Sequence, residues 1–160
     1  MFISNGFTVK YLISLWLTLL NESVKFTYQE FEIKPSPSSR KKKTIYRPII
    51  PVIMMSGKNL VGYRAVVDSG SDYCVFEAQV ALYLGINLTA GNKRKIRGIG
   101  GNTIKGYEHK VLFKVAGKQY ETKVIFSKQI PENSFGVLGS QGLFDNFKVI
   151  FNYPTYIEVA

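Results

Sequence analysis

The sequence predicts a mainly β fold with one hydrophobic core. Runs rich in Val, Ile and Thr recur along the chain, and 11 Phe and 10 Tyr add to a composition that favours strands. The 14 glycines supply the tight turns that such a fold needs. With 160 residues, 46% of them hydrophobic, the chain is long enough for one core and a short extension.

The N-terminal part of the chain precedes the well-patterned region. Its apolar run, residues 11–20, is too short to span a bilayer, which needs about 20 residues. We therefore expect residues 1–23 to be a dispensable extension, and we do not favour membrane anchoring by residues 2–20. Residues 24–46 would comprise a first strand and a basic linker, and residues 47–160 the main domain.

Short strands joined by tight turns are expected along the rest of the chain. Apolar and alternating segments predict strands at 26–33, 49–55, 62–67, 73–76, 111–115, 119–126, 135–139, 148–151 and 156–159. The glycine-rich stretch 93–107 predicts a hairpin with a mobile tip. Two short helices are expected, one at 77–84 that Gly85 ends and one at 141–147.

One aspartate lies at the end of an apolar strand. Asp68 is followed by Ser69 and Gly70, and a second apolar strand leads away. Gly70 lets backbone approach closely, so Asp68 suits a carboxylate displayed at a shared site. The chain has three aspartates (Asp68, Asp72 and Asp145) and no second Asp-Ser-Gly or Asp-Thr-Gly. If two carboxylates perform the chemistry together, the second must come from another copy of the chain.

Three motifs follow one another in order. They are Asp-Ser-Gly-Ser-Asp at 68–72, the glycine-rich hairpin Ile-Arg-Gly-Ile-Gly-Gly-Asn-Thr-Ile at 96–104, and Gly-Val-Leu-Gly at 136–139. Together they resemble the retropepsins, the family of retroviral proteases and their bacterial relatives, and the resemblance covers about 47–157. It implies a closed, mainly β acid-protease barrel with a flap hairpin and one or two short helices, active as a homodimer on a peptide or protein substrate.

The resemblance implies a role for each matching residue. Asp68 would be the catalytic aspartate, Ser69 would bond across the dimer axis beneath the two aspartates, and Gly70 would line the path of the substrate backbone. The expected substrate-binding residues are Asp72, Gly98, Ile99, Gly100 and Leu138. Among them, Ile99 and Gly100 would form the flap tip, and Leu138 would pack behind the active site between Val137 and Gly139. The terminal strand at 156–159 would join the subunits.

The implied activity is that of an aspartic endopeptidase. Two carboxylates a few ångströms apart cannot both ionise, so the pair would hold a single proton, as in aspartic proteases generally. The ionised oxygen would take a proton from water, which attacks the peptide carbonyl, and the protonated partner would donate to the carbonyl oxygen. Each subunit would contribute one Asp68.

The sequence departs from the retroviral pattern after the third motif. Retroviral members carry an arginine there that pairs with the second aspartate of the first motif, but here Gly139 is followed by Ser140 and Gln141, so Asp72 lacks that partner. A catalytically inactive dimer that binds peptides or proteins is therefore the alternative function. Arg97, at the shoulder of the flap, indicates a preference for acidic side chains near the scissile bond.

Basic residues give the chain a net charge of +10. Nine of the 21 lie in two clusters, Arg40, Lys41, Lys42, Lys43 and Arg47, then Lys93, Arg94, Lys95 and Arg97. Such clusters can attract nucleic acid or anionic membranes. No aromatic stacking platform or nucleic-acid motif accompanies them, so a solvated linker and a solvated hairpin are expected, with no nucleic-acid partner and no membrane.

Cysteine and histidine offer a rival chemistry. Cys74 and His109 are the only residues of their types, which leaves a Cys-His peptidase formally open. Cys74 lies in an apolar strand, where a buried structural cysteine is the commoner case. Without clustered His or Cys, we expect no metal and no cofactor. A single cysteine excludes an intrachain disulfide, which fits the expected cytoplasmic location.

Overall fold

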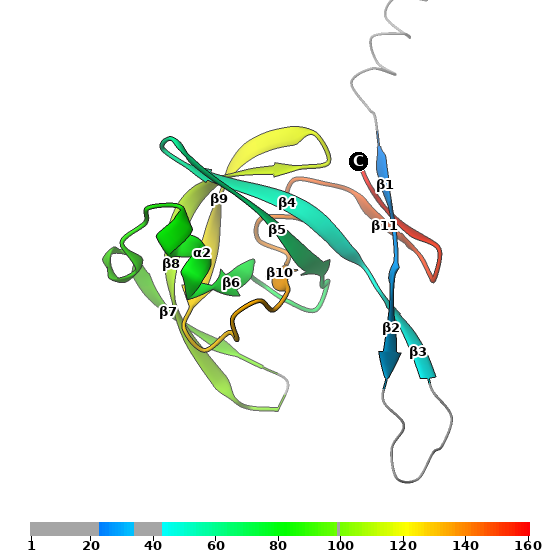
Figure 1. The fold of residues 1–160 in the computed structure, drawn as a ribbon, viewed down its shortest axis with the longest axis horizontal. Helices are drawn as coiled ribbons and strands as arrows, with labels where there is room; N and C mark the ends of the chain where they lie inside the picture. Colours follow the sequence, from blue (N-terminus) through cyan, green and yellow to red (C-terminus); the bar gives the residue numbers. More distant parts are fainter. Residues whose placement is uncertain (1–22, 34–42, 99) are drawn as a thin grey trace, which may run out of the picture.

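Seven strands form one sheet that closes on itself. They are β4 (Ile49–Ser56), β5 (Asn59–Val67), β6 (Val75–Glu77), β7 (Asn92–Arg97), β8 (Thr103–Val115), β9 (Lys118–Ser127) and β10 (Gly136–Leu138). In this computed structural model, which describes residues 23–33, 43–98 and 100–160, their order is β4-β5-β10-β6-β9-β8-β7. A further pairing of β4 with β8 closes the sheet into a barrel (Figure 1).

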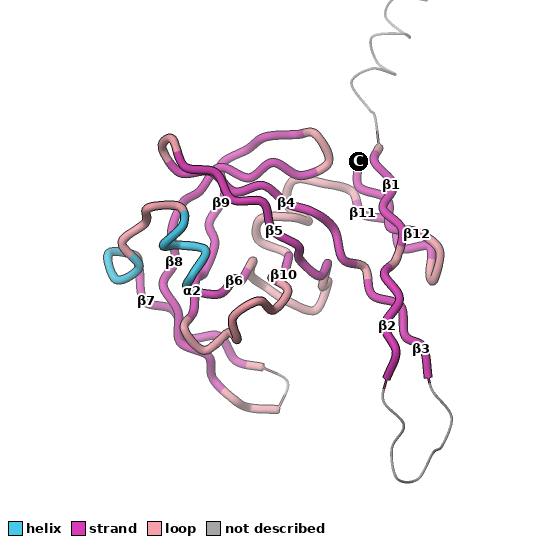
Figure 2. The backbone as a smooth tube through the Cα atoms, viewed as in Figure 1, coloured by secondary structure: helices cyan, strands magenta, loops and turns pink. Residues whose placement is uncertain are grey.

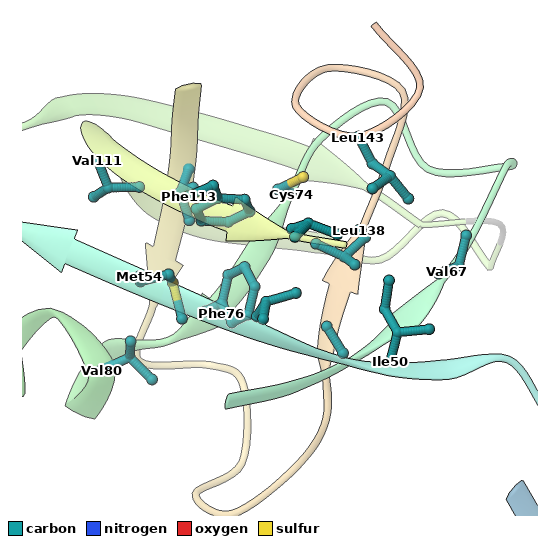
Figure 3. Packing of buried hydrophobic residues seen from close by; sticks show 14 of the residues in the cluster. Ile50, Met54, Val67, Cys74, Phe76, Val80, Val111, Phe113, Leu138 and Leu143 are labelled. Carbon is teal, nitrogen blue, oxygen red and sulfur yellow. The ribbon is translucent and has the colours of Figure 1, made fainter. Parts of the chain in front are cut away.

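The core of the barrel follows from alternation along its strands. In β8, Val111, Phe113 and Val115 are buried, whereas the residues between them face outward. Met54 of β4 and Phe76 of β6 are also fully buried, and Figure 3 shows them beside Phe113. The apolar segments that predict strands therefore form the walls of one continuous core.

One short α-helix packs against the barrel. It is α2 (Ala78–Tyr83), whose Val80 and Ala81 are buried. The helix ends before Gly85, which has a positive φ of 70° that favours glycine, as the sequence predicts. A single 3₁₀ turn, η1 (Leu88–Ala90), follows, and the Asn87 side chain accepts a hydrogen bond from the Thr89 amide. Figure 2 shows helix confined to this part of the described chain.

The second predicted helix, at 141–147, is wrong: this segment forms successive turns. Gly142 has a φ of +114°, which a right-handed helix does not allow. A Cβ at Gly142 would lie 2.8 Å from Cys74 Sγ and 3.0 Å from Thr122 Oγ1, so the backbone packs here as only glycine permits. Leu143 and Phe147 still reach the core, which explains the helix-like spacing of the sequence.

A second, three-stranded sheet contains the C-terminal strands. Its order is β1 (Val24–Thr27), β12 (Tyr156–Val159) and β11 (Val149–Asn152), all antiparallel. The predicted strand 26–33 breaks at Tyr28, whose amide donates to the Thr155 carbonyl at 3.3 Å. Beyond the break, β2 (Gln29–Ile33) pairs with β3 (Lys43–Arg47) as a separate hairpin, and Figure 1 shows both features on the side of the barrel away from α2.

Several expectations concern residues outside the described part. The extension 1–23, apart from its last residue, and most of the charge cluster from Arg40 to Lys43 fall there. The proposed boundaries at residues 23 and 46 stay predictions. Among the described residues, no helix is both long and apolar enough to cross a membrane.

Candidate active site

Asp68 lies where β5 leaves the barrel. The preceding residue, Val67, is buried, and its amide donates to the Pro48 carbonyl at 2.9 Å. The Asp68 amide donates to the Leu138 carbonyl at 3.0 Å, which continues the parallel pairing of β5 with β10. A buried strand therefore fixes the backbone of Asp68, while its side chain is exposed.

The turn after Asp68 holds one carboxylate oxygen in place. The Gly70 amide donates to Asp68 Oδ1 at 2.9 Å, and the Ser71 amide donates to the Asp68 carbonyl at 3.2 Å. A Cβ on Gly70 would lie 3.3 Å from the same Oδ1, so a side chain there would crowd the carboxylate. Ser69 is exposed beside it. The turn thus presents a carboxylate that is oriented by a backbone amide and accessible from outside.

The segment after β10 supports this turn from behind. The Ser140 amide donates to the Ser71 carbonyl at 2.8 Å, and the Gln141 amide donates to the Asp72 carbonyl at 2.9 Å. Gly139 makes this close approach possible, because a Cβ there would lie 2.5 Å from the carbonyl oxygens of Ser71 and Tyr73. The first and third sequence motifs are therefore joined backbone to backbone.

The two remaining predicted residues of this region differ in exposure. The Asp72 side chain is exposed, and within the described chain it forms no ion pair, consistent with the missing arginine. Leu138 is 0% exposed, so its side chain lies in the core and has no exposed surface in the single chain, while its backbone carbonyl accepts from the Asp68 amide. Its neighbour Val137 faces the other side of β10 and is partly exposed.

The predicted flap is the hairpin of β7 and β8. The Gly98 amide donates to the Asn102 carbonyl at 2.9 Å, and the Gly101 amide donates to the Gly98 carbonyl at the same distance. Gly101 has a φ of +80°, which favours glycine at this turn. Gly98 and Gly100 are exposed, whereas Ile99 lies outside the described residues. Their contact with substrate stays a prediction.

A buried carboxylate that sequence reasoning missed holds the base of this hairpin. Glu108 on β8, 6% exposed, accepts two hydrogen bonds of 3.0 Å from the Arg94 guanidinium, and Lys123 Nζ lies 3.7 Å from its Oε1. The Arg94 hydrogen bond lowers the pKa of Glu108 against the opposing effect of burial, and the charges of Arg94 and Lys123 add to the lowering. The hydrogen bond to Glu108 and the charge of Glu108 in turn raise the pKa of Arg94.

A second buried carboxylate that the sequence analysis does not predict binds the loop that leads into β10. Glu77, 5% exposed, accepts from the Asn133 amide at 3.1 Å, and its Oε1 lies 2.6 Å from the Tyr63 hydroxyl. That hydroxyl also lies 2.7 Å from the Ser134 carbonyl oxygen. Burial, with the Glu77 hydrogen bond next, raises the pKa of Tyr63. In the sequence, the one feature that could have indicated this role of Glu77 is its position as an acidic residue within the apolar segment 75–78.

The Cys-His alternative finds no support in the geometry. Cys74 is fully buried, and burial raises the pKa of its thiol to about 12, so the nucleophilic thiolate is scarce at neutral pH. His109 Nε2 lies 2.8 Å from the Leu88 carbonyl oxygen instead. Within the described ranges, no group of three or more His, Cys, Asp and Glu side chains is arranged to hold a metal ion.

Comparison with known proteins identifies the fold. No family model and no curated protein matches the chain. A retropepsin-like aspartic protease from Rickettsia conorii superposes with a TM-score of 0.53 at 16% identity, covering 87% of this chain and 96% of that one. The chain has a retropepsin-like fold. The structure of EIAV protease complexed with the inhibitor HBY-793 is also similar to this chain. It superposes with a TM-score of 0.50 at 24% identity, covering 66% of this chain and 93% of that one.

Proposed function

We propose that the chain is an aspartic endopeptidase that works as a homodimer. The observation that carries the proposal is the presentation of Asp68: an exposed carboxylate at the end of a buried strand, with one oxygen held by the Gly70 amide. The retropepsin-like fold supports the proposal because the two similar structures are proteases. Without such a site, a shared fold would say little about activity.

A single copy of the chain supplies half of the proposed site. The other two aspartates, Asp72 and Asp145, do not follow a buried strand with an Asp-Ser-Gly turn. A second Asp68 from a twofold-related copy would complete the carboxylate pair on the symmetry axis. The Ser69 side chains, next to the aspartates in sequence, would bond to each other's loops across this axis.

The chemistry would be hydrolysis of a peptide bond by an activated water. The two carboxylates share one proton, because both cannot be ionised at this separation. The ionised carboxylate takes a proton from water, whose oxygen forms a bond to the carbonyl carbon, and the protonated one donates to the carbonyl oxygen. The C–N bond then breaks as a proton passes to the leaving amine. The β7–β8 hairpin would close over the extended peptide and exclude water.

One feature favours the alternative of a dimer that binds peptides without cleaving them: the Asp72 carboxylate has no basic partner among the described side chains. For either function, β12 is paired on both edges within one chain, so it has no free edge for a partner subunit. Assembly then depends on other surfaces or on exchange of β1. The free thiol of Cys74 fits the cytoplasm as the proposed location of either function.

Replacing the proposed catalytic aspartate tests the function. Wild type, Asp68→Asn and Asp145→Asn are compared on a peptide library from pH 3 to pH 7 at equal concentration. We expect Asp68→Asn to lose activity by at least about 100-fold, since it removes the groups that move the proton. Asp145→Asn should cleave like wild type because Asp145 is exposed and outside the Asp68 turn.

Each contrary result has a definite meaning. Equal cleavage by wild type and Asp68→Asn would refute the role of Asp68. No cleavage by either, with peptide binding and a dimer established by sedimentation, would replace the proposal with the binding alternative.

A further inference from the structure

Four cations share one face of the β7–β8 hairpin. Lys93, Lys95 and Arg97 alternate along β7, so their side chains point to the same side, and Lys105 of β8 lies directly opposite Lys95. All four are exposed. Like charges directly opposite each other destabilise a strand pair. The hairpin therefore carries an electrostatic cost on this face.

Among the described side chains, no carboxylate forms an ion pair with these four cations. On β8, the residues opposite Lys93 and Arg97 are Tyr107 and Thr103. The nearby Glu108 belongs to the other face, where it pairs with Arg94 and Lys123. The charge of the four cations is available to a partner.

The same strand also has a free backbone edge. β7 is last in the order of the seven-stranded sheet and pairs with β8 alone among the described strands (Figure 2). Antiparallel pairing uses the backbone groups of every second residue, so the others point away from β8. A pocket lies over the paired residues of β7 and β8. It is lined by Lys93, Arg94, Lys95, Lys105, Gly106 and Tyr107.

We propose that the β7 edge docks an extended acidic segment of the substrate by adding it to the sheet as a strand. This inference rests on the proposed peptidase function and names its substrate class: proteins with acidic residues at alternating positions. Side chains two residues apart on a strand are about 6.6 Å apart, so alternating carboxylates on an added strand match Lys93, Lys95 and Arg97 in spacing and sign.

Two other roles of such cations explain less of the arrangement. Lysines on an edge strand deter pairing with a second, identical edge, and the same charges attract a strand of opposite sign. A nucleic acid would also be attracted, but sequence-tolerant binding of single strands relies on stacking aromatic side chains. The pocket offers the half-buried Tyr107 as its single aromatic side chain. An acidic peptide uses both the charges and the free edge.

A binding measurement with the inactive full chain tests this inference. Asp68→Asn prevents turnover of the probe, a fluorescein-labelled peptide with Glu and Thr in strict alternation. We expect it to bind at least about tenfold more tightly than a peptide of the same composition with its Glu residues in one block, because only alternation aligns carboxylates with the cations. Raising the salt from about 50 to 200 mM should weaken binding.

Charge reversal at the edge provides the matched comparison. Lys93→Glu with Lys95→Glu, in the Asp68→Asn background, should weaken binding of the alternating peptide by at least about tenfold. Lys58→Glu with Lys114→Glu changes the net charge equally at exposed positions away from β7 and should bind like the parent. Circular dichroism confirms folding, and Lys93→Gln with Lys95→Gln replaces the reversed pair if it fails to fold.

Three results would overturn the inference: equal binding of the alternating and block peptides, equal weakening by both charge-reversed pairs, or tighter binding of a single-stranded oligonucleotide than of the alternating peptide. Cleavage of short neutral peptides, measured separately with the Asp68 side chain intact, keeps failure of the docking site distinguishable from failure of the peptidase proposal.

Discussion

Gly139 is the residue at which the Asp68 turn and the segment behind it come closest. The carbonyl oxygens of Ser71 and Tyr73 occupy the positions against which a Cβ would collide. Both are backbone atoms within hydrogen-bonded loops, so neither can rotate away as a flexible side chain could. The position of the proposed catalytic carboxylate therefore depends on the absence of a single methyl group.

Gly139→Ala tests this dependence. We expect a loss of about 2–3 kcal/mol in the free energy of unfolding, as is typical of overpacking a tight site, together with loss of peptide cleavage. Gly62→Ala is the matched control, because Gly62 lies in β5 with nothing within 4 Å of its Cβ position. Urea denaturation of both variants measures the difference. Equal stability of the two would show that the loops rearrange freely around Gly139.

Site residues whose contacts lie within one turn could be predicted from the sequence. Residues whose contacts join distant parts of the chain could not. Asp68 and Gly70 are two positions apart, and the hydrogen bond between them is a property of the turn itself. Glu77 binds the amide of Asn133, 56 residues away, and no local pattern in the sequence encodes that pairing. Leu138 was predicted to contact substrate, but its place in a three-residue strand buries it.

At the scale of elements, the β7–β8 hairpin combines one neutralised face with one uncompensated face. On the first face, Glu108 offsets the charge of Arg94 and also lies close to Lys123 of β9. Its pKa is lowered in the folded chain, so the group stabilises the fold fully above its unfolded pKa and loses that contribution as the pH falls through the lower folded value. The hairpin should therefore weaken in acid.

Glu108→Gln isolates this effect. Between about pH 5 and pH 3, the free energy of unfolding of wild type should fall more steeply than that of Glu108→Gln, because the variant has no proton to gain there. Glu121→Gln, which removes the exposed partner of Lys110 on the neighbouring β8–β9 strand pair, should follow wild type. Parallel pH profiles for wild type and Glu108→Gln would contradict the assignment. Urea denaturation at each pH provides the measurement.

The sequence predicts the hairpins of the barrel well because their turns are marked by glycine. The turn between β4 and β5 has Gly57 at a φ of +56°, and that between β8 and β9 has Gly117 at +81°. The helix predicted at 141–147 is wrong because the apolar spacing of this segment suits both a helix and a series of turns. Tertiary contacts of Gly142 with Cys74 and Thr122 decide between them. No local signal marks the break at Tyr28.

On the scale of the whole molecule, a single chain completes both its barrel and its terminal sheet without strands from a second copy. β12 is flanked by β1 and β11, and the C-terminal Ala160 exchanges two backbone hydrogen bonds of 3.0 Å with Lys148. The proposed active site is incomplete in the same chain, since it holds one Asp68. Folding and activity should thus respond differently to dilution.

Mixing subunits tests the shared site. After exchange, a 1:1 mixture of wild type and Asp68→Asn should retain about one quarter of the activity of wild type at the same total concentration, because about one dimer in four then has two aspartates. Independent monomers would retain about one half and would refute the shared site. A mixture of wild type with Asp145→Asn serves as the control and should keep full activity.

The buried thiol of Cys74 provides a built-in probe for local opening of the barrel. It is the one cysteine among 160 residues, it lies in the core beside Gly142, and burial raises its pKa to about 12. A thiol-reactive dye attacks the thiolate, so it modifies the chain only when the wall of the barrel beneath the Asp68 turn comes apart. The labelling rate of unmodified protein thus reports how often that wall opens, and how far a bound peptide slows it, without any engineered probe.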